Sequence, residues 1–184
     1  HVVLADMSMP PPDGIALAAK LRAEQPQVRV IVLTLHEAPQ MAREALRAGA
    51  AGLSSGLEYT PGSFAPAEEI AELCKVVAKY RGVYATHMRD QGKHIRAAIE
   101  EALRVGRESG AVVQISHIKL AEEAVWDKQE LILEPVEAAR REGLEVYLDQ
   151  YPYTATSSGF LSSFPGWAVA GGVAALKARL ADPE

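Results

Sequence analysis

Apolar residues along this chain alternate between two spacings, in a repeat of roughly thirty residues. Short runs rich in β-branched residues are typical of buried strands, whereas apolar residues three or four positions apart are typical of helices with one buried face. The runs predict strands at residues 1–6, 28–33, 51–55, 83–87, 112–117 and 144–149. The helical spacing predicts helices at residues 13–25, 39–49, 66–82, 95–110, 128–142 and 172–181. Strands and helices therefore alternate, which predicts an α/β fold with a parallel sheet.

Two histidines end successive strands of this pattern. Residues 82–119 form one strand–helix–strand unit, whose strands finish at His87 and His117. The carboxyl ends of parallel strands lie at one edge of a sheet, where such folds bind their ligands. If the two strands are adjacent, their ends lie about 5 Å apart, which allows one metal ion to bridge both imidazoles. Zinc takes three or four ligands, so the spacing alone leaves open both a metal site and two ordinary polar residues.

The composition is that of an ordinary soluble globular protein. Of the 184 residues, 48% are apolar and 23% are charged, which is enough for one domain with a substantial core. The net charge of −5 and the lack of a basic patch argue against nucleic acid or anionic lipid as a partner. The longest apolar run, residues 30–35, is too short to span a membrane, and no export signal is visible.

The chain has a single cysteine, Cys74. It excludes an internal disulfide and fits a reducing compartment, so we expect a cytoplasmic location. Because Cys74 shares the apolar face of a helix with Ile70, Leu73 and Val77, we expect it to be packed in the core. The chain begins at His1 inside a strand, without an initiator Met, and we therefore interpret it as a fragment or an excised piece.

A first set of motifs lies in residues 1–52: DMSMP at 6–10, DG at 13–14, VLTLHE at 32–37 and ALRAGA at 45–50. This segment resembles the second half of a response-regulator receiver domain. The resemblance implies that Asp6 is the phosphoryl acceptor and that Thr34 responds to it. The strand with the family's metal-binding acidic pair is missing, and Gly56 stands where a lysine is expected. Because little would then offset the charge of a phosphorylated Asp6, the alternative is that both residues are without function.

A second set of motifs follows: GLSSGLEY at 52–59, PGSF at 61–64, YATHMRD at 84–90, QISHIK at 114–119, DQYPY at 149–153, FPGW at 164–167 and RLADP at 179–183. Residues 51–184 resemble the N-acyl-D-amino-acid deacylases of the amidohydrolase superfamily. The resemblance implies a TIM barrel with zinc at the carboxyl ends of its strands and hydrolysis of an acyl–nitrogen bond. It assigns His87 and His117 as zinc ligands. It places Lys119, Tyr151 and Ser157 at the carboxylate of the acyl-amino acid, which a cation and two hydroxyls suit.

Several parts of that family's site are missing from the chain. These are the His-x-His pair of the first strand, the cysteine ligand of the second strand and the catalytic aspartate of the last strand. We therefore expect zinc to bind at a weak or partial site. We expect one α/β domain over residues 1–184, with a receiver-like segment at 1–50 and a deacylase-like segment at 51–184. Six parallel strands would form a partial TIM-barrel-like sheet, two strands short of closure.

Three hypotheses follow from the sequence. The first is an incomplete and inactive zinc deacylase, whose small-molecule partner would be an N-acyl amino acid. The second is a non-catalytic chimeric α/β scaffold, and the third is a phosphoryl-accepting receiver module. Under each of them the edges of an unclosed sheet favour self-association.

Overall fold

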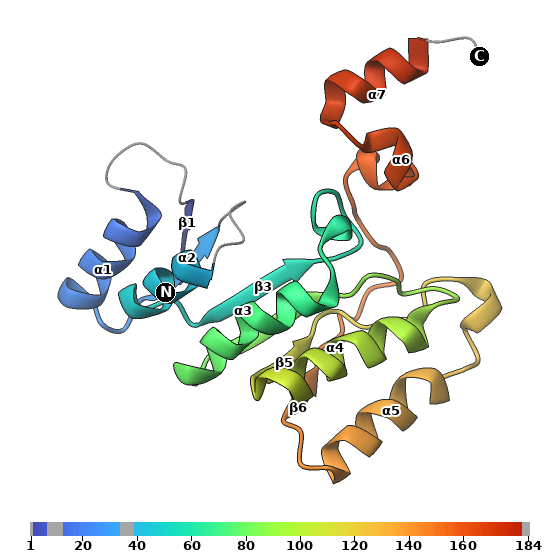
Figure 1. Cartoon of the computed structure of the whole chain (residues 1–184). Coiled ribbons are helices and arrows are strands. Elements are labelled where there is room, and N and C mark those ends of the chain that lie inside the picture. The colour runs from blue at the N-terminus through green and yellow to red at the C-terminus, as the bar shows by residue number, and fades with distance from the viewer. Residues whose placement is uncertain (1, 7–12, 34–38, 182–184) are drawn as a thin grey trace.

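The computed structural model describes residues 2–6, 13–33 and 39–181 (Figure 1). The first four elements are β1 (Val2–Asp6), α1 (Gly14–Glu24), β2 (Arg29–Leu33) and α2 (Pro39–Ala48). The others are β3 (Gly52–Gly56), η1 (Gly62–Phe64), α3 (Ala67–Lys79), β4 (Val83–His87), α4 (Ile95–Ser109), β5 (Val112–Ile115), η2 (Glu123–Val125), α5 (Glu130–Arg141), β6 (Val146–Leu148), η3 (Phe160–Ser163), α6 (Gly166–Val169) and α7 (Gly172–Ala181). Strands and helices alternate as the hydrophobic pattern predicts, and the predicted α/β class is confirmed.

Local chemistry explains where the helices begin and end. The side chain of Asp13 accepts a hydrogen bond of 2.8 Å from the backbone N–H of Ala16, which caps α1. Gly110 ends α4 with a φ of 75°, a left-handed conformation that glycine adopts at little cost. Gly106 lets α4 approach the sheet closely, because a Cβ at this position would lie 2.6 Å from Cγ2 of Val113.

The strands form two sheets, so the prediction of one six-stranded sheet is wrong. The parallel strands β1 and β2 form one pair, and β3, β4, β5 and β6 form an open parallel sheet in sequential order. Among the described residues, one parallel bridge, between Val30 and Ala50, connects the two sheets. Because β3 consists of glycine and serine with one leucine, it offers few side chains to pack against a further strand.

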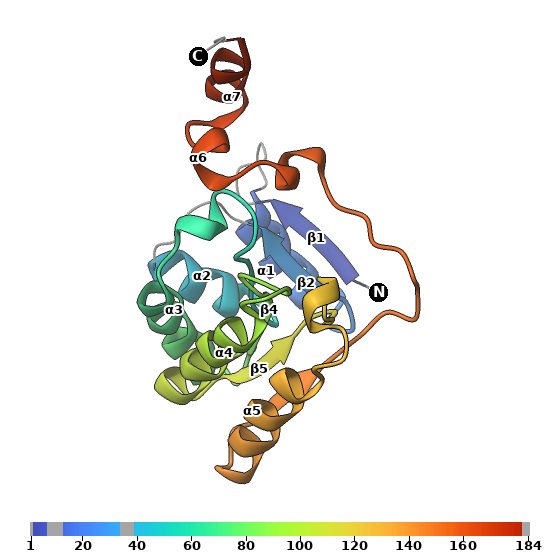
Figure 2. The same ribbon diagram turned by 90° about the vertical axis from the view of Figure 1, so that its right-hand side faces the viewer.

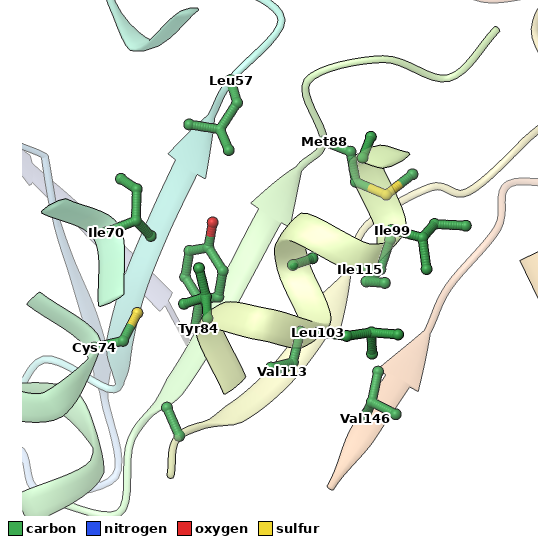
Figure 3. Packing of buried hydrophobic residues seen from close by; sticks show 14 of the residues in the cluster. Leu57, Ile70, Cys74, Tyr84, Met88, Ile99, Leu103, Val113, Ile115 and Val146 are labelled. Carbon is green, nitrogen blue, oxygen red and sulfur yellow. The ribbon is translucent and has the colours of Figure 1, made fainter. Parts of the chain in front are cut away.

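Helices α3, α4 and α5 cover one face of the four-stranded sheet (Figures 1 and 2). Helix α4 packs against both of its neighbours. Figure 3 shows the core between helices and sheet, in which Cys74 is fully buried, as the sequence predicts. Its members from the strands and helices include Tyr84, Val113, Ile115, Val146, Ile70, Ile99 and Leu103. Burial of this apolar surface is the main force that holds the helix layer to the sheet.

The opposite face of this sheet carries a row of small and polar residues. Ser54, Ala85, Gln114 and Tyr147 are register partners across β3 to β6. Successive residues of a strand point to opposite faces, so this row points away from the buried face that holds Tyr84 and its neighbours. Tyr147 is 52% exposed, and no helix of the described chain covers this face in either view.

The amino-terminal pair of strands joins the rest mainly through helices. Ala18, Val30 and Ala48 form a small core of their own. Helix α2 packs against α3, and Arg47 Nε donates a hydrogen bond of 3.1 Å to the hydroxyl of Tyr80, just after α3.

Helices α6 and α7 lie together at one end of the molecule, beyond the helix layer (Figures 1 and 2). Leu176 packs against Ala168 and Val169 in a third small core. Arg179 ties the two helices by donating from Nη1 to the carbonyl oxygens of Ala168 and Ala170, at 2.9 and 2.6 Å. None of the helices in the described ranges combines the length and the apolar character needed to cross a membrane.

Candidate metal and substrate site

The two predicted ligands reach the carboxyl edge of the sheet in different ways. His87 is the last residue of β4, as predicted. His117 is not at a strand end, because β5 stops at Ile115 and the chain turns there, with a φ of 39° at His117. The carboxylate of Asp149, directly after β6, accepts a hydrogen bond of 2.6 Å from the backbone N–H of His117. This hydrogen bond holds the turn and places the second imidazole beside the first.

The imidazoles of His87 and His117 face each other. Nδ1 of His87 lies 3.0 Å from Nε2 of His117, and the ring centroids are 4.6 Å apart in an edge-to-face arrangement. Two ring nitrogens at this distance share one proton, or both turn lone pairs toward a cation that lies between them. The two predicted metal ligands therefore lie side by side at this edge of the sheet.

Glu58 contacts the other nitrogen of His87. Its carboxylate forms a hydrogen bond with Nε2, from the loop that follows β3. The backbone N–H of Leu57 donates to the carbonyl oxygen of His87 at 2.9 Å, and the ring centroid of Tyr59 lies 4.6 Å from that of His87. The β3–α3 loop therefore encloses His87 from one side.

Lys119 and Tyr151, two of the predicted substrate residues, lie close to the pair. Nζ of Lys119 donates to Gln91 Oε1 at 2.5 Å and to the carbonyl oxygen of His117 at 3.2 Å. The same ammonium lies 5.3 Å from the ring centroid of Tyr151. Gln91 is buried, and its amide nitrogen lies 3.1 Å from Nε2 of His87. Lys119 is thus both a cation beside the imidazoles and the residue that orients Gln91.

The other predicted site residues do not join this group in the described structure. Ser157 is exposed in the segment between β6 and η3. Asp6 is the last residue of β1, but its side chain lies outside the described residues, as does Thr34 altogether. Their roles stay predictions.

The surroundings of His117 favour its neutral form. Burial, followed by the neighbouring His87 and Lys119, lowers the pKa of the His117 imidazole. Its Nδ1 is buried and has no hydrogen-bond partner among the described residues. A neutral imidazole is the form that binds a metal ion.

The facing nitrogens suit a zinc ion as two of its ligands, because imidazole is a ligand that zinc prefers. Within residues 2–6, 13–33 and 39–181, no group of three or more His, Cys, Asp and Glu side chains is placed to hold a metal ion. The described part of the chain thus fits half of a zinc site.

Sequence reasoning missed Glu58, Gln91 and Asp149. Each of them follows the end of a strand closely: Glu58 after β3, Gln91 after β4 and Asp149 after β6. The rule that the carboxyl ends of parallel strands share one edge applies to these residues as much as to the histidines. That rule would have identified them as candidates.

Two cavities flank the histidine pair. One, of about 500 Å³, has Glu58 and Tyr59 on one wall and Leu161, Phe164 and Leu176 on the other. The second, of about 600 Å³, lies beside Lys119 and Asp149. Both cavities therefore lie beside residues that contact the histidine pair.

The amino-terminal segment matches a known family. The family model of the response regulator receiver domain matches residues 1–54, which confirms the resemblance that the sequence motifs predict.

The longer segment matches characterised enzymes of one type. A D-aminoacylase of Alcaligenes xylosoxydans xylosoxydans is 44% identical over 118 residues, which are 64% of this chain and 24% of that enzyme. The N-acyl-D-glutamate deacylase of the same organism is 39% identical over 119 residues, 65% of this chain and 24% of that enzyme. The deacylase-like segment resembles the D-aminoacylases. The chain spans about a quarter of the length of these curated relatives.

Solved structures agree with the sequence matches. N-acyl-D-glutamate deacylase from Bordetella bronchiseptica, complexed with zinc and a phosphonate inhibitor, superposes with a TM-score of 0.66 at 33% identity, over 77% of this chain and 34% of that one. A D-aminoacylase structure superposes with a TM-score of 0.63 at 33% identity, over 82% of this chain and 39% of that one. The L-hydantoinase of Arthrobacter aurescens, at 18% identity and a TM-score of 0.53 over 82% and 39%, shares the fold alone. The TIM-barrel-like class predicted from the D-aminoacylase resemblance is confirmed, with the sheet open.

Proposed function

We propose that this chain carries part of the active site of a zinc-dependent N-acyl-D-amino-acid deacylase, which hydrolyses the C–N bond of an acylated amino acid. The observation that carries the proposal is the pair of facing nitrogens, Nδ1 of His87 and Nε2 of His117, 3.0 Å apart at the carboxyl edge of the sheet. Both histidines lie in the segment that resembles D-aminoacylases.

We assign the following roles to residues of this chain. His87 and His117 would hold the zinc ion. When bound, zinc in such a site polarises the amide carbonyl and lowers the pKa of a bound water. Lys119, Tyr151 and Ser157 would bind the substrate carboxylate. Because the ammonium of Lys119 already lies beside Tyr151, a carboxylate entering here meets a cation and a hydroxyl from the same side.

By itself, the chain is expected to bind zinc weakly and to lack deacylase activity. The described residues supply two strong ligands and no third one. Two ligands hold zinc less firmly than the three or four of a complete site. A non-catalytic chimeric α/β scaffold is the alternative, and this missing third ligand favours it.

Metal binding is the experiment that separates the two. Zinc affinity is measured by competition with a chromogenic chelator, for the unaltered chain and for His87→Ala, His117→Ala and His94→Ala. His94 is the matched control, since it is an exposed histidine before α4 whose side chain does not cap that helix. We expect either site variant to abolish the weak binding and His94→Ala to leave it unchanged. Zinc binding that persists without both His87 and His117 would refute the site.

The receiver-like segment has a second candidate function, favoured by the match over residues 1–54. In this function Asp6 would accept a phosphoryl group. Gly56 in place of lysine removes a group that would stabilise the added charge, so we propose that this activity is lost.

A further inference from the structure

Two groups with opposite requirements meet at Nε2 of His87. The carboxylate of Glu58 only accepts hydrogen bonds, so it requires a proton on Nε2. The amide nitrogen of Gln91, 3.1 Å from the same atom, only donates, so it requires a lone pair there. A neutral imidazole carries one proton, and its position on Nε2 or Nδ1 can satisfy one of these groups but not both.

Gln91 cannot resolve the conflict by turning its amide over. Its Oε1 accepts a hydrogen bond of 2.5 Å from the ammonium of Lys119, and the side chain is buried. A rotated amide would set its N–H groups against the ammonium, and both groups are donors. Lys119 therefore keeps the donor end of Gln91 on His87.

The backbone holds Glu58 in place against this competing donor. The backbone N–H of Leu57 donates a hydrogen bond to the carbonyl oxygen of His87. Farther along the same loop, the guanidinium of Arg89 donates to the carbonyl oxygens of Ser63 and Ala65, both at 2.8 Å. The side chain of Glu58 is 44% exposed, but its loop is fixed at both ends.

The charge on Glu58 decides the competition. A hydrogen bond to a carboxylate is roughly twice as strong as one between neutral groups. We infer that Glu58 is a positioning residue that keeps the proton of His87 on Nε2, against Gln91, and so leaves Nδ1 free to face His117 and a shared cation. The role toward the cation rests on the proposed function, whereas the position of the proton does not.

The test follows the proton directly in the metal-free chain. The ¹⁵N shifts of the His87 ring, recorded at about pH 8 where imidazole is neutral, distinguish protonated from unprotonated nitrogen. We expect protonated Nε2 in the unaltered chain and a shift of the proton to Nδ1 in Glu58→Ala, since Gln91 then donates unopposed. Glu58→Gln should restore part of the Nε2 form through its amide oxygen. The double variant Glu58→Ala with Gln91→Ala, in which neither group acts, should give a mixture of both forms.

Zinc affinity provides the second readout. Removal of a residue that orients a histidine ligand typically weakens metal binding by about 10- to 100-fold, and we expect a loss in that range for Glu58→Ala. The control is Glu137→Ala, which removes the same charge from the exposed surface of α5. Circular dichroism establishes that each variant is folded.

The outcomes separate this inference from the proposed function. An unchanged ¹⁵N pattern in Glu58→Ala would overturn the inference, even if zinc binds as proposed. A shifted proton with unchanged zinc affinity would overturn the role of Glu58 toward the cation. Zinc binding that survives the loss of both histidines would instead refute the proposed site, and with it that role, while the proton assignment stands on its own readout.

Discussion

Arg89 and Glu101 form a two-pronged ion pair between the end of β4 and helix α4. Nε and Nη2 of Arg89 donate to both carboxylate oxygens of Glu101, at 2.9 and 2.8 Å in the shorter contacts. The hydrogen bond to Glu101 raises the pKa of Arg89, so the guanidinium stays charged. The same guanidinium donates hydrogen bonds to the carbonyl oxygens of Ser63 and Ala65 in the β3–α3 loop. It therefore connects the helix layer to the loop that carries Glu58.

We expect Arg89→Met to destabilise the chain by about 2 to 3 kcal/mol. Loss of one partner of a buried pair costs about 3 to 5 kcal/mol, and the partial exposure of these side chains, 33% and 18%, reduces that figure. Urea unfolding measures the change. Arg96→Met is the matched control because it breaks a pair with Glu134 in which both side chains are more exposed, and it should cost less than about 1 kcal/mol. Equal losses in the two variants would contradict the role given to Arg89.

Cys74 should be unreactive in the native chain. Burial raises the pKa of its thiol to about 12, and only the thiolate reacts readily with disulfide reagents. At about pH 8 we expect Ellman's reagent to label Cys74 at the rate of unfolding, and at once in denaturing urea. Rapid labelling without denaturant would mean that the core of α3 opens in the native state.

The same thiol predicts a loss of stability in alkali. Its pKa is higher in the folded chain than the ordinary value of 9.0, so the stabilisation is complete below pH 9 and declines as the pH rises toward 12. At about pH 10 the loss is on the order of 1 kcal/mol. Urea unfolding at pH 8 and pH 10 should show this decline in the unaltered chain and a smaller decline in Cys74→Ala. An equal decline in both would exclude Cys74 as its cause.

Asp6 should not be phosphorylated by acetyl phosphate with Mg²⁺. Gly56 stands where a lysine that would contact the phosphoryl group is expected, so little would offset the added charge. Mass spectrometry after incubation measures the modification. Stoichiometric labelling that disappears in Asp6→Asn would show that the receiver half still works.

The chain should self-associate through the open edges of its sheets. Strand β6 pairs with β5 on one side, and its other side has no strand partner among the described residues. Unpaired backbone groups on an edge strand favour pairing with a second chain, and a charge on the strand opposes it. Light scattering should therefore show dimers or larger species, with a larger monomer fraction for Tyr147→Lys. Val173→Lys is the control, because Val173 on α7 is as exposed as Tyr147, at 52%, but does not lie on an edge strand. A monomeric unaltered chain would refute the prediction.

We expect no deacylation of N-acetyl-D-amino acids above the rate without protein, even with added zinc. The reason is that the described residues place no third ligand beside the two histidines, and self-association does not supply one. An amine-release assay measures this. Turnover that His87→Ala abolishes would mean that other residues complete the site.

The βα alternation could be predicted from the sequence because it depends on local patterns. Helix α7 was expected at residues 172–181 and is found there, and Asp13 caps α1 as its residue type predicts. The break between the sheets could not be predicted in this way. Whether a strand pairs with its neighbour depends on side chains of both strands and of the helices that cover them, and β3 is poor in such side chains.

In the candidate site, too, local patterns could be predicted from the sequence and tertiary contacts could not. His87 and His117 could be predicted because each ends a run of β-branched residues, although the run around His117 continues past the point where strand pairing stops. The opposed contacts of Glu58 and Gln91 on one nitrogen could not be predicted. Both side chains come from loops, and only tertiary structure fixes the distances between them.

The join between the two sheets has a consequence for the sequences that can form it. A strand pair demands matched register along its length, since each backbone group must find its partner. A pair of helices demands only complementary surfaces, which many sequences provide. Within the described part of the chain, α2 packs against α3, and the strands contribute one bridge. The segment that resembles a receiver domain and the segment that resembles D-aminoacylases meet near Ala50, and a contact of this kind places few demands on the sequence of either segment.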